Sequence, residues 1–130
     1  MPRAKQLSAW VEDRPGVLGQ VARALGEKKV SIRAFMASSM GGRGFVRVVV
    51  DSPAVARRVL RAHGWTVTED EVVEVTTADR PGALGAVADR LGAKGINIQY
   101  AYVGQAGAAR RVNFYLAVDD VKAALAALRG

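Results

Sequence analysis

The residues DRPGVLGQVARALGEK at 13–28 return, little changed, as DRPGALGAVADRLGAK at 79–94. The flanking residues keep the same offset of 66, so that Lys5–Gly64 aligns with Glu71–Gly130 and no gap is needed. Identical residues outside the opening stretch include Ile32 with Ile98, Gly41 with Gly107 and Val46 with Val112. A repeat that keeps its register in this way predicts two copies of one supersecondary unit.

Each copy has the residue pattern of a strand, a helix, two strands and a second helix. Short β-branched or apolar segments predict the strands, and apolar residues at helical spacing predict the helices. In the first copy the predicted strands are 5–11, 31–37 and 45–50, with helices after Pro15 and after Ser52. In the second copy they are 71–77, 97–103 and 112–116, with a last helix over about 119–129. The predicted fold class is α+β, with two ferredoxin-like βαββαβ units whose antiparallel sheets carry their helices on one face.

The segment Trp65–Glu69 predicts a further strand, and the second copy has no counterpart of it. We expect it to complete the first unit, giving units at 5–69 and 70–130, with Trp65 packed on the first. Alternatively, it turns at Glu69-Asp70-Glu71 and forms a hairpin with the next strand. In the first arrangement the second unit keeps an open edge, and a homodimer paired through Glu71–Thr77 would cover it.

Composition places the chain among globular proteins. Half of its 130 residues are apolar, the formal net charge is +7, and cysteine is absent. No apolar run is long enough for a membrane span, and no signal-peptide core follows Met1, so we expect a cytoplasmic protein. The core face of the two first helices should bury Leu18, Val21, Leu25, Leu84, Val87 and Leu91.

The repeated Asp-Arg-Pro-Gly turn suits a zwitterionic ligand. The following helix N-terminus carries unpaired N–H groups and partial positive charge, which stabilise a carboxylate. Asp13 or Asp79 can face an ammonium group, and Gly16 or Gly82 lets a ligand approach the backbone closely. The alternative interpretation is that each Asp merely caps its helix, since this turn is also good chemistry for starting any helix.

A short strand, then D-R-P-G, an amphipathic helix and a strand of the Gly95-Ile96-Asn97-Ile98 type resembles the ACT domain. The chain resembles a stand-alone tandem of two such domains, which are regulatory modules that commonly bind amino acids between modules. The resemblance implies a non-catalytic sensor and two sets of candidate ligand-binding residues. The first set is Asp13, Arg14, Pro15, Gly16, Val17, Leu18 and Ser31. The second set is Thr77, Asp79, Arg80, Pro81, Gly82, Ala83, Leu84 and Asn97.

The second copy fits the ACT pattern better, because Thr77 is polar where the first copy has Val11, and Asn97 is longer than Ser31 of the first copy. We therefore expect the better pocket at the second turn, and a larger loss of binding from Asp79→Ala than from Asp13→Ala. The sequence does not name the amino acid or the regulated enzyme or regulator.

Two other functions stay open. One is a structural tandem that binds a partner protein and no ligand. The other, less favoured, is RNA binding: Arg43-Gly44-Phe45 begins like the signature of RNA-recognition modules, but Arg47 stands where a second stacking aromatic is needed. With one histidine and no cysteine we expect no metal site, no cofactor and no enzyme activity.

Overall fold

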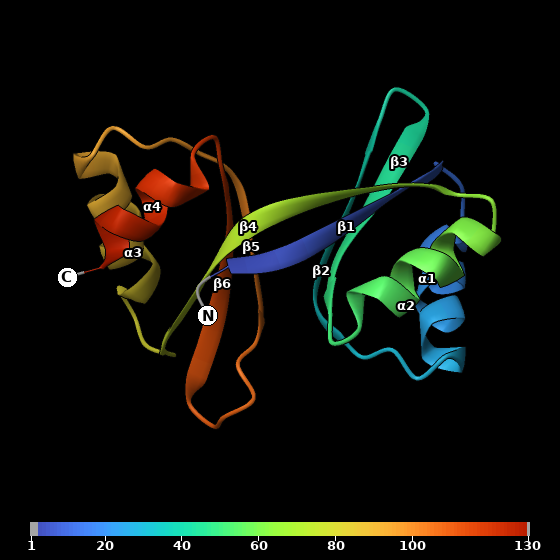
Figure 1. The fold of residues 1–130 in the computed structure, drawn as a ribbon, viewed down its shortest axis with the longest axis horizontal. Coiled ribbons are helices and arrows are strands. Elements are labelled where there is room, and N and C mark those ends of the chain that lie inside the picture. The colour runs from blue at the N-terminus through green and yellow to red at the C-terminus, as the bar shows by residue number, and fades with distance from the viewer. Residues whose placement is uncertain (1–2, 130) are drawn as a thin grey trace. The chain divides into compact units, whose positions relative to one another are not determined.

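The computed structural model describes residues 3–129, and within that range it contains four helices and six strands. In chain order they are β1 (Arg3–Glu12), α1 (Val17–Glu27), β2 (Ile32–Met40), β3 (Arg43–Val50), α2 (Pro53–Ala62), β4 (Thr66–Ala78), α3 (Ala83–Ala93), β5 (Ile98–Gln105), β6 (Arg111–Val118) and α4 (Val121–Leu128) (Figure 1). The α+β class and the repeated order of elements are as the sequence predicts. Gly130, the last residue of the repeat, lies outside the described residues.

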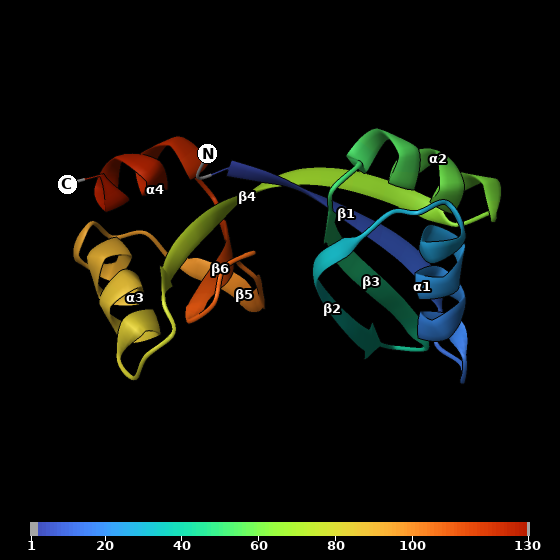
Figure 2. The ribbon, with the colours of Figure 1, turned by 90° about the horizontal axis from the view of Figure 1, so that it is seen from below.

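The chain divides into two units. The first unit is Lys5–Asp70, and the second combines residues from Glu71 onward with the N-terminal residues up to Ala4. In the first unit β3 pairs antiparallel with both β1 and β2. In the second, β6 pairs antiparallel with both β4 and β5. In each unit the two helices pack against each other, α1 on α2 and α3 on α4 (Figures 1 and 2).

Each unit has its own hydrophobic core. In the first unit α1 and α2 contribute Val21, Leu25 and Leu60 to a cluster with Leu7 and Val48 of the strands. Burial of side chains of this size stabilises the fold by about 1.5–3 kcal/mol each. In the second unit the corresponding cluster contains Val87, Leu91, Leu116 and Ala124, among others.

The predicted helix core is correct at four positions and wrong at two. Val21, Leu25, Val87 and Leu91 are buried, but Leu18 is 42% exposed and Leu84 is 48% exposed. The helices begin at Val17 and Ala83, and the buried face of α1 runs Val17, Val21, Ala24, Leu25. Because successive residues on a helix are about 100° apart, Leu18 and Leu84 fall beside this stripe and not on it.

The strand β4 shows what happens to the segment Trp65–Glu69. Thr66–Ala78 is one continuous strand, so the predicted alternative of a turn at Glu69-Asp70-Glu71 is wrong. Val67 is buried in the first core, and Trp65 packs against the same cluster. The expected placement of Trp65 on the first unit is confirmed. Three adjacent acidic residues disfavour a tight turn, whereas in an extended strand their side chains alternate between opposite faces.

The first residues of β1 belong to the second unit, where the sequence predicts an open edge. Arg3 and Ala4 group with Glu71 and the residues after it, and β1 and β4 are hydrogen-bonded neighbours. The Arg3 Nη1 atom lies 3.0 Å from Glu71 Oε1. Thus β1 reaches from the first unit into the second, as β4 does, and the chain itself covers part of the edge that motivated the homodimer.

The structural alignment of the two copies requires a gap, contrary to the sequence analysis. Val11 pairs with Gly44 in the first unit, whereas its counterpart Thr77 pairs with Val112 and not with Arg110. The helix caps agree with this shift, because α2 follows Ser52 and α4 follows Asp120. From the β5–β6 loop onward the structural offset is therefore 68 and not 66, which makes that loop two residues longer. The gapless alignment fails because Val46 matches Val112 in sequence, which hid the two-residue insertion in the loop before β6.

No helix within residues 3–129 is both long enough and apolar enough to cross a membrane.

Candidate functional site

Both turns place a glycine at the start of a helix. Gly16 has φ 89° and Gly82 has φ 87°, a left-handed conformation that glycine adopts without steric cost. Neither α1 nor α3 has a side-chain cap on its N-terminus. Asp13 and Asp79 therefore do not act as helix caps, and the first-turn N–H groups, which have no partner within a helix, are not used by a capping side chain.

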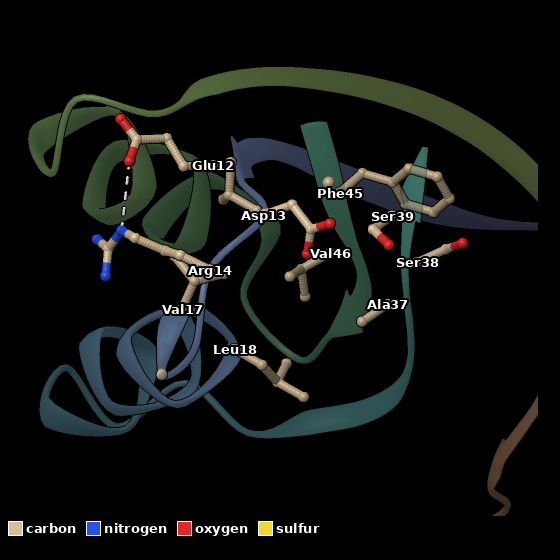
Figure 3. Close-up of a pocket in the computed structure, with 13 residues that line it drawn as sticks. Glu12, Asp13, Arg14, Val17, Leu18, Ala37, Ser38, Ser39, Phe45 and Val46 are labelled. Atoms are coloured by element: carbon tan, nitrogen blue, oxygen red, sulfur yellow. Dashed lines mark ion pairs between the residues drawn. The ribbon is translucent and has the colours of Figure 1, made fainter. Parts of the chain in front are cut away.

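A cavity of about 300 Å³ lies beside the first turn (Figure 3). The turn and the start of α1 supply Asp13, Arg14, Gly16, Val17 and Leu18 to its wall. The opposite wall comes from the end of β2 and the start of β3. It includes Ala37, Ser38, Ser39, Gly44, Phe45 and Val46. The cavity thus combines hydroxyl groups, carboxylates and an apolar patch.

The charged side chains at this cavity point in different directions. Figure 3 shows the Asp13 carboxylate pointing across the cavity toward the strand residues, while Glu12 and Arg14 point the other way. Arg14 Nε lies 3.4 Å from Glu12 Oε2, and Arg14 Nη2 donates a hydrogen bond of 2.9 Å to Gln20 Oε1. Asp13 makes no ion pair with any other residue that the structure describes. Its carboxylate is therefore available to a cationic group.

Gly44, in the strand wall of the cavity, has no side chain to fill the space. A Cβ atom at this position would lie 3.2 Å from the Ser38 carbonyl oxygen and 3.5 Å from Val11 Cγ2. In the second unit the residue paired with Thr77 at the same place is Val112. A valine side chain therefore stands in the second unit where the first unit has only hydrogen.

The second turn makes different hydrogen bonds from the first. Asp79 N donates a hydrogen bond of 2.8 Å to the carbonyl oxygen of Arg110, in the longer β5–β6 loop. Thr77 Oγ1 donates to the carbonyl oxygen of Ala78, so this hydroxyl is used locally. Asp79, Arg80, Pro81, Gly82 and Leu84 are exposed, and Ala83 is buried. The sequence favoured this turn, yet the cavity described above lies at the first.

Ser31 and Asn97 lie away from the turns of their own units. Ser31 precedes β2, and its backbone N donates a hydrogen bond of 3.0 Å to Asp51 Oδ1. The cavity is formed by Ala37, Ser38 and Ser39 at the opposite end of the same strand. Six or more residues of extended strand place that end about 20 Å away. Asn97 is exposed and holds the corresponding position before β5. Pro15 is exposed in the turn.

The sequence analysis missed the strand residues of the cavity. Ser38, Ser39 and Gly44 follow the turn by more than twenty positions and carry no recognised motif. The structure places Gly41-Gly42 in the turn of the β2–β3 hairpin, so that the end of β2 lies beside the start of β3, which in turn pairs with the end of β1. This glycine pair was the sequence feature from which the strand wall of the cavity could have been inferred.

The described residues contain no group of three or more histidine, cysteine or acidic side chains able to hold a metal ion.

The fold and site define a tandem of two ferredoxin-like α+β modules with a ligand-sized cavity at a helix N-terminus. A family model described as an ACT domain pair matches residues 3–121. The chain therefore belongs to the family of ACT domain pairs, as the D-R-P-G turns and the repeat indicated.

Solved structures share the fold. Protein BT0572 from Bacteroides thetaiotaomicron is 26% identical, with a TM-score of 0.87 over 98% of this chain and 87% of that one. The regulatory subunit of aspartate kinase from Thermus thermophilus is 18% identical, with a TM-score of 0.67 over 98% of this chain and 90% of that one. The same subunit from Thermus flavus has a TM-score of 0.66 at 18% identity, over 98% and 91% of the two chains. No curated protein matches the sequence.

Proposed function

We propose that this protein is a non-catalytic regulator that binds a small free amino acid in the cavity beside the first turn. The observation that carries the proposal is the position of Asp13. Its carboxylate faces the cavity without an ion-pair partner among the described residues, next to a helix whose N-terminus has no side-chain cap. Membership of the ACT family supports a regulatory, ligand-sensing role.

The cavity offers a partner for each part of an α-amino acid. The ammonium group would face Asp13, with the hydroxyl groups of Ser38 and Ser39 nearby. The carboxylate would accept hydrogen bonds from the first-turn N–H groups of α1, where the helix dipole favours negative charge. Leu18, Ala37 and Val46 would contact a small side chain. The cavity volume of about 300 Å³ is at the lower end of the range for small-molecule sites.

A thermal-shift screen of the twenty common amino acids tests the proposal. A ligand at a hundred times its dissociation constant should stabilise the fold by about 2.7 kcal/mol. Calorimetry with the amino acid found should then show that Asp13→Asn weakens binding about tenfold to a hundredfold, because a hydrogen bond to a charged group is lost. No stabilisation and no heat with any amino acid would overturn the proposal.

Asp79→Asn is the matched control, since Asp79 holds the same position in the second unit. We expect it to leave binding at the first turn unchanged. An equal loss from both variants would indicate two equivalent sites, and a larger loss from Asp79→Asn would place the site at the second turn, as the sequence alone favoured.

One observation favours the alternative of a protein-interaction tandem. A second cavity of about 190 Å³, between α1 and β2, is lined only by apolar residues, including Leu18, Phe35 and Ile32. Phe35 is 52% exposed. This function would require a partner protein and no amino acid.

The geometry of Phe45 gives little support to RNA binding. The ring is only 8% exposed and lies edge-on to Trp10, with the Arg47 guanidinium carbon 4.1 Å from its centroid. A base could therefore reach little of its surface for stacking.

A further inference from the structure

Two further cavities of the first unit share three side chains. They measure about 290 and 370 Å³, and both are lined by Arg14, His63 and Trp65. The shared side chains mean that the two cavities adjoin each other. The amino-acid site proposed above uses neither His63 nor Trp65.

An aromatic platform forms the common wall. The rings of His63 and Trp65 are stacked, with centroids 5.3 Å apart and planes 10° from parallel. Trp65 packs against the first core, which holds it in place, while His63 is exposed. His63 Nδ1 donates to the Val59 carbonyl oxygen at 3.0 Å, so that Nε2 is the ring nitrogen left for a ligand. A planar ring could stack on the outer face of His63.

Arginine side chains surround this platform. Arg14 and Arg23 line one cavity together with Glu27, and Arg14 and Arg43 line the other together with Glu12. Arg14 is held by Glu12 and Gln20, whereas Arg23 forms no ion pair with any described residue. Guanidinium groups bind carboxylates and phosphates through paired hydrogen bonds. The positive side chains outnumber the negative ones at each cavity.

The fold itself does not require these side chains. The helices α1 and α3 bury equivalent residues, such as Val21 and Val87, against their own cores. At the cavity-lining positions, however, α3 has Ala86 where α1 has Gln20 and Asp89 where α1 has Arg23. A helix that packs in the same way therefore forms with an aspartate in place of Arg23.

We propose that the adjoining cavities bind an aromatic anion: a planar ring stacked on His63, with a phosphate or carboxylate bound by Arg23 and Arg14. The net charge of +7 would raise the local concentration of such an anion. The phosphate form would be a nucleoside monophosphate, and the carboxylate form a free aromatic acid.

Fluorescence and calorimetry test this site. In a Trp10→Phe variant, Trp65 is the one remaining tryptophan, and AMP should quench its emission in a saturable way. Calorimetry should then compare AMP and benzoate, with adenosine and inorganic phosphate as the separate halves of AMP. Binding of AMP alone identifies a phosphate-bearing ligand, and binding of benzoate identifies a carboxylate-bearing one; either supports the site.

Variants decide whether the binding is specific. Arg23→Asp, which installs the residue of the second unit, should weaken binding at least about tenfold, and His63→Ala should weaken it too. Arg58→Asp is the control, since Arg58 is exposed on α2 and lines neither cavity. Melting temperatures confirm that each variant is folded.

Three results would overturn the site. These are no binding of AMP or benzoate at millimolar concentration, an equal loss in Arg58→Asp, or preferred binding of a single-stranded RNA that falls steeply with salt and does not depend on His63.

Discussion

A single hydrogen atom at Gly44 keeps the first-turn cavity open. The second unit has Val112 at the equivalent place, and the remaining residues of the two turns are nearly the same. Similar turns can therefore have different surroundings because of a residue on another strand.

Gly44→Val should close the amino-acid site. Its Cβ would lie 3.2 Å from the Ser38 carbonyl oxygen, so the β2–β3 hairpin must shift by a few tenths of an ångström to admit it. We expect a folded protein in which the amino acid no longer raises the melting temperature. Gly26→Ala is the control, because a Cβ there meets nothing within 4 Å, and it should keep binding and gain about 0.5–1 kcal/mol of stability. Undiminished binding in Gly44→Val would place the ligand elsewhere.

Asn113 is a buried polar residue whose amide is fully used. It is 7% exposed, accepts a hydrogen bond of 2.6 Å from Thr76 Oγ1, and donates to Gln105 O and Tyr115 Oη at 3.0 Å each. Asn113→Ala should therefore lower the free energy of unfolding by about 1–3 kcal/mol, measured by denaturant titration. The exposed Asn97→Ala should change it by no more than about 0.5 kcal/mol. Equal effects would show that these hydrogen bonds add nothing to stability.

At the scale of elements, β4 determines how the two copies are joined. It supplies Val67 to the first core and Val73 to the second, and no turn interrupts it. The acidic residues Glu69, Asp70 and Glu71 lie in mid-strand and are exposed, with Glu69 near both Lys5 and Arg57. These exposed ion pairs contribute about 0–1 kcal/mol each, so the continuity of the strand rests mainly on its buried valines.

Asp70→Pro tests this continuity. Proline fixes φ and removes an N–H donor, so within a continuous strand it should destabilise the fold by about 1–3 kcal/mol in denaturant titration. Asp70→Ala should stay within about 0.5 kcal/mol of the parent protein. A proline variant as stable as the alanine variant would mean that residues 69–71 form a turn in solution.

At the scale of the whole molecule, the homodimer through Glu71–Thr77 stays a prediction. Arg3 and Ala4 already cover part of this edge, and Arg3 is paired with Glu71. Removing residues 1–4 should leave the backbone groups of the edge exposed and increase self-association, because an unpaired strand edge templates pairing with another chain. Light scattering on the full and shortened chains measures this. A full chain that is monomeric at micromolar concentration would contradict the dimer, and equal association of both chains would exclude this edge.

The sequence by itself determined the local structure. The repeat gave the order of the elements, the D-R-P-G turns gave the helix starts, and apolar spacing placed Val21, Leu25, Val87 and Leu91 in the cores. These features were predictable because turn chemistry and helical spacing depend on residues within a few positions of one another. The family resemblance rested on the same short-range patterns.

Only the tertiary structure decided what depends on pairing between distant residues. Leu18 and Leu84 are exposed because each follows the first buried residue of its helix, Val17 or Ala83, by about 100° and so lies beside the buried stripe. The path of β4, the two-residue shift of β6 and the cavity at Gly44 all follow from strand register. Register is set by side-chain packing across strands, and a valine matches another valine in sequence even where their strands have shifted. For this reason the sequence favoured the second turn as the site, whereas the packing of β2, β3 and α1 opened a cavity at the first.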